Sequence, residues 1–177
     1  IDKFPFSADA NATDVGDLTV ARDAAAGQSS RESGYSSGGY GTSATIFNTI
    51  DKFPFSADAN ATDVGDLTVA RISPSGQSST ESGYSSGGNS TGFPIPYFNI
   101  IDKFPFAADA NATDVGDLSQ ARSSTTGQSS SISGYISSGR SPATVNTIDK
   151  FPFAADANAT DVGDLTQERT DPAGQQV

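Results

Sequence analysis

Apolar positions along the chain fall into short clusters that return about every fifty residues. The string IDKFPF begins at residues 1, 50, 101 and 148, so the spacings are 49, 51 and 47 residues. Residues 1–22 and 50–71 are identical. Between these clusters lie the polar string GQSS and then SGYSSGG or SGYISSG. A period near fifty predicts a repeat architecture in which each unit is one small supersecondary structure.

Each unit is predicted to contain four short strands. Gly, Ser, Asp, Asn and Thr dominate, and no helical i, i+3, i+4 stripe of apolar residues occurs. In the second complete unit the strands are expected over 76–79, 83–86, 99–106 and 114–118, with turn-forming residues between them. The stretch that follows the second strand varies in length between units, so we expect a surface loop there.

The third strand of each unit is apolar on both faces. In the segment 50–55, Ile50 is expected to face one side and Phe53 and Phe55 the other. Such a strand belongs in a sheet that is covered on both faces, as in the stacked blades of a β-propeller. Pro54 has no backbone N–H for a ladder, so it predicts the end of the strand or a bulge. The sequence therefore predicts an all-β fold, a β-propeller of four-stranded blades.

Composition excludes several kinds of chemistry. The chain of 177 residues has no Cys, His, Met or Trp, and its net charge is -11. A disulfide, a Cys/His zinc site, a Cys nucleophile and a Ser-His-Asp triad are all excluded. The negative charge argues against nucleic acid as a partner, and no apolar run approaches the length of a membrane helix. Leu, Ile, Val and Phe make up about 19% of the residues, which is typical of disorder, but the regular period predicts a folded array instead.

The order of the motifs resembles the kelch repeat of β-propellers over essentially the whole chain. The shared features are a Gly-Gly doublet after the second strand, at 38–39 and 87–88, and an arginine before the first strand of the next unit. These arginines are Arg22, Arg71, Arg122 and Arg169. The third unit departs from the pattern with Ser138-Gly139-Arg140, and the family's fourth-strand tryptophan is absent. The strings DKFPF, NATDVGDLT and SGYSSGG further resemble kelch-like repeats of marine cyanophages and other marine microbes, which implies a component of a virion or a surface.

A single repeat array is expected over 1–177, with about 3.5 blades. The units are 1–22 (partial), 27–71, 76–122, 127–169 and 170–177, the last being the start of a further unit. A four-bladed ring would lack one strand, the one that carries GYSSGG. We therefore expect the ring to be completed by further sequence or by a partner.

Asx-rich turns between the third and fourth strands are candidate calcium sites. Oxygen-bearing side chains at positions 1, 3, 5 and 9 of the turn resemble the calcium loops of some propellers, and Ca²⁺ takes six to eight oxygen ligands. Asp14 stands where such loops need Gly, so a plain turn remains the alternative. The candidate residues are Asp9, Asn11, Asp17, Asp58, Asn60, Asp66, Asp109, Asn111 and Asp117. No other cofactor is expected.

Two further groups of side chains have a structural and a functional interpretation. The arginine at the end of each unit either binds an acidic ligand or pairs with an aspartate such as Asp63 or Asp66 between blades. Aromatic residues in the variable loops either pack over blade edges or contact a protein or a sugar. The loop aromatics are Tyr40, Phe47, Phe93, Tyr97 and Phe98.

The expected function is non-enzymatic. Carboxylates recur in every unit, whereas a catalytic site is normally unique. We predict a structural or binding module of a virion fibre, tail or decoration assembly, extracellular in location. Its expected partners are other protein subunits or a surface glycan, and neither nucleic acid nor membrane insertion is expected. The alternative is a secreted or cell-surface propeller that binds carbohydrate or calcium.

Overall fold

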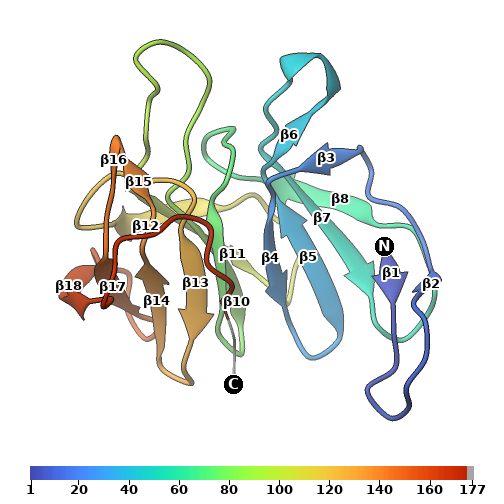
Figure 1. Ribbon diagram of the computed structural model, residues 1–177. Coiled ribbons are helices and arrows are strands. Elements are labelled where there is room, and N and C mark those ends of the chain that lie inside the picture. Colours follow the sequence, from blue (N-terminus) through green and yellow to red (C-terminus); the bar gives the residue numbers. More distant parts are fainter. Residues whose placement is uncertain (175–177) are drawn as a thin grey trace.

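The computed structural model describes residues 1–174. Within these residues the chain forms three four-stranded antiparallel sheets and three two-stranded pairs (Figure 1). The helical content of this part is a single 3-10 turn at Thr42–Ala44. The all-β prediction is therefore confirmed.

The three sheets follow one another along the chain and share one topology. The first sheet consists of β4 (Ala26–Ser29), β5 (Ser33–Ser37), β7 (Thr49–Pro54) and β8 (Thr62–Asp66). The second consists of β9 (Ser75–Ser78), β10 (Ser82–Ser86), β11 (Ile100–Pro105) and β12 (Thr113–Asp117). The third consists of β13 (Thr126–Ser129), β14 (Ser133–Ser137), β17 (Thr147–Pro152) and β18 (Thr160–Asp164).

The small pairs lie outside these sheets. They are β1 (Asp2–Lys3) with β2 (Thr13–Asp14), β3 (Arg22–Asp23) with β6 (Tyr40–Gly41), and β15 (Arg140–Ser141) with β16 (Ala143–Thr144). The β1–β2 pair corresponds to the third and fourth strands of a unit, and we call residues 1–18 the N-terminal hairpin. The predicted strands of the second sheet differ from the observed ones by at most one residue at either end.

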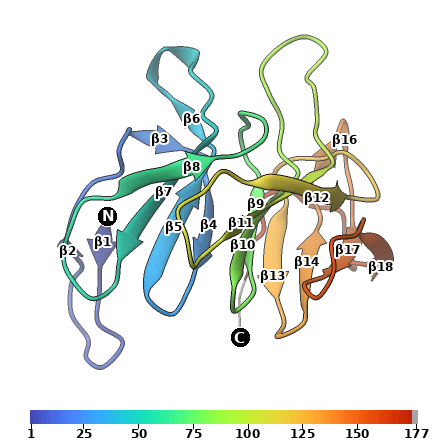
Figure 2. The same ribbon diagram turned by 180° about the vertical axis from the view of Figure 1, so that it is seen from behind.

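The first strands of the three sheets lie next to one another. β4 contacts β9, and β9 contacts β13. Glycine allows this approach, because a Cβ added at Gly76 would overlap the carbonyl oxygen of Gly27, and one at Gly127 would overlap that of Gly76. β18 lies at one edge of the molecule, and the β1–β2 pair lies at the opposite edge (Figure 2). No sheet closes on itself within residues 1–174, so the propeller stays a prediction.

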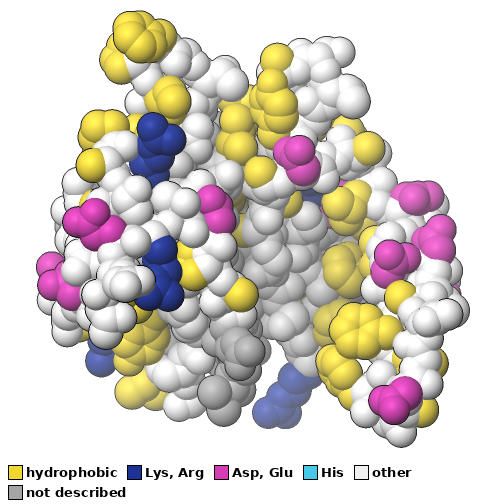
Figure 3. All heavy atoms as spheres, in the orientation of Figure 1, with side chains coloured by type: hydrophobic (Ala, Val, Ile, Leu, Met, Phe, Trp, Pro, Cys, Tyr) yellow, Lys and Arg dark blue, Asp and Glu magenta, His cyan; other side chains and the backbone are white. Residues whose placement is uncertain are grey.

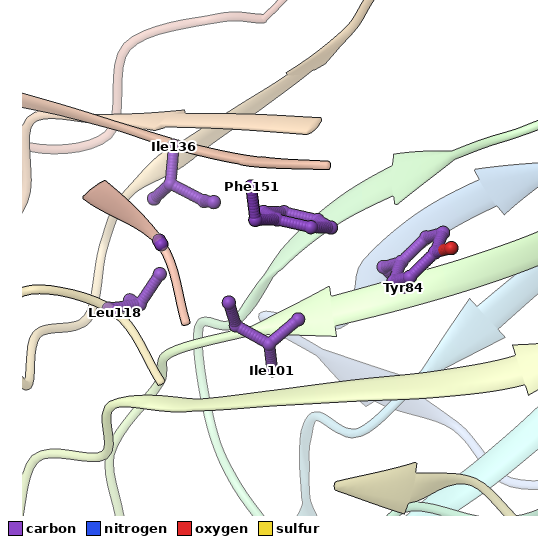
Figure 4. Close-up of a cluster of buried hydrophobic side chains, with 6 residues drawn as sticks. Tyr84, Ile101, Leu118, Ile136 and Phe151 are labelled. Carbon is purple, nitrogen blue, oxygen red and sulfur yellow. The ribbon is translucent and has the colours of Figure 1, made fainter. Parts of the chain in front are cut away.

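The core lies between consecutive sheets rather than within one sheet. Ile101 of β11 belongs to the cluster shared with the third sheet, together with Tyr84, Leu118, Ile136 and Phe151 (Figure 4). Phe104 of the same strand belongs to the other cluster, shared with the first sheet. The third strand therefore buries apolar side chains on both faces, as predicted. Its proline is the last strand residue in each sheet, which confirms the expected strand end.

The described residues include no helix of the length and apolar character that crossing a membrane requires.

Candidate binding surfaces

The variable loops gather at one end of the molecule. The loops that follow β5, β10 and β14 extend to the top of the view in Figure 1, whereas the turns between the first two strands of each sheet lie at the bottom. The stacked sheets thus separate a loop end from a turn end. The length differences between units fall at the loop end, as the sequence predicts.

The longest of these loops, residues 89–98, carries an exposed apolar tip. The ring of Phe93 is fully exposed, and Ile95 is also exposed to solvent. Figure 3 shows hydrophobic side chains at this tip. Backbone hydrogen bonds fix the base of the loop, because Ser90 N donates to Pro96 O at 3.0 Å and Phe98 N donates to Gly88 O at 2.8 Å. The tip is thus held away from the sheets on a fixed base.

The other predicted loop aromatics are half-buried. Tyr97 and Phe98 lie at the base of the same loop, and Tyr40 lies in the β3–β6 pair. Phe47 covers a buried arginine, since the guanidinium carbon of Arg22 lies 6.0 Å from its ring centroid. These four side chains are partly packed against the rest of the protein. Of the five predicted loop aromatics, Phe93 is the one that is fully exposed.

Six of the nine candidate calcium residues lie in the turns between third and fourth strands, whereas Asp66 and Asp117 end β8 and β12 and Asp17 follows β2. Asp58 Oδ1 lies 3.0 Å from Lys3 Nζ, and Asp109 Oδ1 lies 3.0 Å from Lys52 Nζ. Asn60 Oδ1 accepts a hydrogen bond from the backbone N of Asp17 at 2.9 Å. The hydrogen bonds that these side chains make therefore run from the turn of one unit to the third strand, or to the end of the fourth strand, of the preceding unit.

The remaining calcium candidates repeat this arrangement. Asn111 accepts from the backbone N of Asp66 at 3.0 Å, and Asn158 accepts from that of Asp117 at 3.0 Å. Asp9 and Asn11, in the N-terminal hairpin, are exposed. Residues 1–174 contain no cluster of three or more acidic side chains that could hold a metal ion. Calcium binding stays a prediction.

Arg22, Arg71 and Arg122 at the unit ends are buried in ion pairs, whereas Arg169 is exposed, and the predicted partners Asp63 and Asp66 were wrong. Arg71 Nη2 lies 2.7 Å from Asp102 Oδ2, in the third strand of the next sheet, and not beside Asp63 or Asp66. Both side chains are fully buried. Burial lowers the pKa of Arg71, and the charge of Asp102 opposes that shift. The equivalent pairs are Arg22–Asp51 at 3.1 Å and Arg122–Asp149 at 3.2 Å.

The aspartate of each pair accepts further hydrogen bonds. Thr68 donates to Asp102 twice, from its backbone N at 2.9 Å and from its hydroxyl at 2.7 Å. Within the described chain, Nε and Nη1 of Arg71 have no hydrogen-bond partner. The pair therefore fixes one sheet against the next, and its burial leaves little surface for an acidic ligand.

A hydroxyl-lined cavity at the turn end was not foreseen from the sequence. Residues 29–31, 78–80 and 129–131 of the three turns enclose about 640 Å³. Part of the serine content has a local role, since Ser79 Oγ accepts hydrogen bonds from the backbone N of Glu81 at 3.2 Å and of Ser82 at 2.9 Å. Arg31 is the charged residue of the lining. The repeated GQSS string identifies these turns in the sequence, but it does not show that the three turns meet in space and form a cavity.

An apolar pocket of about 290 Å³ lies between the N-terminal hairpin and the first sheet. Its aromatic lining comes from Phe4 and Phe6 on one side and Phe53 and Phe55 on the other. At the next two junctions the corresponding phenylalanine pairs pack against a tyrosine of the preceding sheet. The hairpin has no strand that carries such a tyrosine, and the pocket lies in its place.

Comparisons with known proteins give no family. No model of a known protein family matches the chain, and no curated protein matches its sequence. The resemblance to kelch repeats therefore stays a prediction.

Proposed function

We propose that the chain is a non-enzymatic binding module, a kelch-like β-propeller array that presents its variable loops to another protein or to a surface glycan. The observation that carries this proposal is the fully exposed Phe93 at the tip of the 89–98 loop. Aromatic residues are enriched among the side chains that dominate binding energy at interfaces. A loop with a hydrogen-bonded base loses less conformational freedom on binding than a loose one does.

The arrangement of the units supports a scaffold role. Buried arginine–aspartate pairs and shared apolar clusters join consecutive sheets, so the loops are held on a rigid base. Insertions at the loop end leave that base unchanged, because the sheets keep one topology while the loops differ. Several such loops on one end would add their individual contacts.

The proposed setting is a virion fibre, tail or decoration assembly. Its support is the resemblance of the repeats. Mass spectrometry of purified virus particles from the source would detect the chain beside capsid and tail proteins. Its consistent absence from particles would favour the cell-surface alternative.

The loop proposal is tested by the substitution Phe93→Ser. The matched control is Ile132→Ser, since Ile132 is 69% exposed and lies in the β13–β14 turn at the opposite end. Binding of both variants and of the unchanged chain is measured on a glycan panel and on host-cell surfaces. We expect Phe93→Ser to weaken binding at least about tenfold, as loss of a hot-spot aromatic does, and Ile132→Ser to leave it unchanged. Equal binding by all three proteins would refute the role of this loop.

The alternative function is binding of carbohydrate or calcium, and the hydroxyl-lined cavity favours carbohydrate. Hydroxyl groups and backbone amides offer donors and acceptors that suit a neutral polar ligand such as a sugar. A sugar in this cavity would be released by Thr80→Val but not by Phe93→Ser, which separates the two surfaces. A calcium site would raise the melting temperature on addition of Ca²⁺, and Asp58→Ala with Asp66→Ala would remove that rise.

A further inference from the structure

Each junction between consecutive sheets is made by the same set of contacts. At the junction of the second and third sheets, Lys103 Nζ lies 2.9 Å from Asp156 Oδ1, and Ala159 N donates to Asp117 O at 2.7 Å. Gly116 approaches the carbonyl of Ala157 so closely that a Cβ there would overlap it. The junction of the first and second sheets repeats these contacts with Lys52–Asp109, Ala112–Asp66 and Gly65–Ala110. This set defines how one unit packs on the next.

The outer face of the third sheet presents the first half of this set without its counterpart. Gly163 corresponds to Gly116, yet nothing in the described chain lies within 4 Å of a Cβ placed there. Val162 is 52% exposed, whereas its equivalent Val115 packs against a buried cluster. Lys150 has no acidic partner within residues 1–174, and its Nζ lies 5.8 Å from the centroid of the Tyr135 ring. A face built for packing is thus open to solvent.

The N-terminal hairpin presents the second half of this set of junction contacts. Phe6 is 97% exposed and Phe4 is also exposed. The rings of Phe4 and Phe6 lie edge to face, with their centroids 5.5 Å apart and their planes at 81°. The rings of Phe151 and Phe153, which contact a tyrosine of the preceding sheet, have nearly the same arrangement, with a centroid distance of 5.7 Å and an angle of 77°. Asp9, the equivalent of Asp156, is exposed and lies outside the ion pairs of the described chain.

We propose that a second copy of this chain docks its N-terminal hairpin on the outer face of the third sheet, head to tail. The contacts repeat the internal junctions: Lys150 with Asp9, Tyr135 on Phe4 and Phe6, and the Asp164 carbonyl with Ala12 N. This docking continues the pattern of two junctions already formed within the chain, and it is independent of the loop proposal. Since the two surfaces differ, the contact is heterologous, and heterologous contacts generate open chains of copies unless the rotation closes a ring.

Sedimentation of the 177-residue chain over a concentration series tests association. The weight-average mass is expected to rise above 18.1 kDa with concentration and to pass the mass of a dimer. Val162→Asp should weaken association by about tenfold or more, because it removes a valine from the buried patch. Ile132→Glu is the control, since Glu81 and Glu32 occupy that position in the other units. A monomer at every concentration, or equal association of all three proteins, would overturn the proposal.

Cross-linking tests the direction of docking, because the chain has no cysteine of its own. Variants Lys150→Cys and Asp9→Cys are treated with a short bismaleimide, separately and mixed. Head-to-tail docking gives a cross-linked dimer only in the mixture. A dimer from either variant alone would show a symmetric contact and contradict the proposal. The double variant is diluted as well, and a cross-link within one chain there would show that the chain closes on itself instead.

Discussion

The ring of Tyr84, in the second sheet, stacks on the ring of Phe153, just past the last strand residue of β17 in the third sheet. Their centroids are 5.0 Å apart and the planes differ by 21°. Phe151 completes the contact, with its centroid 5.2 Å from that of Tyr84. Tyr35 repeats the arrangement with Phe104 and Phe106 at the preceding junction. One tyrosine and two phenylalanines thus join each pair of sheets.

Removal of the Tyr84 ring should destabilise the fold strongly. Tyr84→Ala is expected to lower the free energy of unfolding by about 3–5 kcal/mol, the range for loss of a buried aromatic side chain. Tyr84→Phe keeps the ring and should cost about 1 kcal/mol at most. Urea unfolding followed by circular dichroism measures both. Similar losses for the two variants would show that the hydroxyl, and not the stack, stabilises the junction.

The buried and the exposed ion pairs of one junction should differ greatly in their effect. Asp102→Asn leaves the charge of Arg71 buried without its partner, so the free energy of unfolding should fall by about 3–5 kcal/mol. Asp109→Asn removes the exposed partner of Lys52 at the same junction and should cost less than about 1 kcal/mol. Denaturant titration of both variants gives the comparison. Equal losses would contradict the role assigned to burial.

Alkaline pH should weaken the fold through Lys52, Tyr84 and Lys103, whose pKa is raised by its hydrogen bond to Asp156. The hydrogen bond to Asp109 raises the pKa of Lys52 above its ordinary value of 10.5, and burial raises the pKa of Tyr84 above 10.0. In all three cases the folded state holds the proton more tightly than the unfolded state does. Their stabilisation is therefore complete below the unfolded pKa and is lost as the pH rises through the folded one. The free energy of unfolding should fall above about pH 10, and less steeply in Tyr84→Phe. An unchanged slope in that variant would contradict the role of Tyr84.

The sequence predicts the strands well because the same pattern recurs in each unit of the chain. Repetition separates the IDKFPF strand from its turns, and the alternation of Ile101 and Phe104 indicates burial on both faces. Strand ends and the alternation of faces depend on residues that are close together in the chain, so the sequence alone is enough to predict them.

Contacts between units were harder to predict. Asp63 and Asp66 lie much nearer to Arg71 in the sequence than Asp102 does, and only the packing of the sheets makes Asp102 the partner. A usable signal was present, since an aspartate inside a strand buried on both faces needs a positive partner. The hydroxyl-lined cavity required three turns to meet in space, and no single unit contains that information.

Ser138 stands where the other units have the first glycine of the doublet. Its φ is 63°, close to the 68° of Gly38 and the 66° of Gly87. A side chain in this left-handed region is strained, so Ser138→Gly should raise the free energy of unfolding by up to about 1 kcal/mol. Thermal unfolding of the two proteins measures the difference. A loss of stability would instead assign a net stabilising role to the Ser138 hydroxyl, which donates to the carbonyl of Ser137.

Two equivalent glycines separate backbone strain from close packing. Gly116 and Gly163 have φ values of 155° and 147°, so alanine is strained at both. At Gly116 the added Cβ also meets the backbone of Ala157, whereas at Gly163 it meets open space in the described chain. Gly116→Ala should therefore cost about 1–3 kcal/mol more than Gly163→Ala, the range for overpacking a tight contact. Urea unfolding at low protein concentration makes the comparison without self-association. Equal losses would mean that the second and third sheets can move apart at little cost, and the rigid junction on which the loop scaffold depends would be refuted.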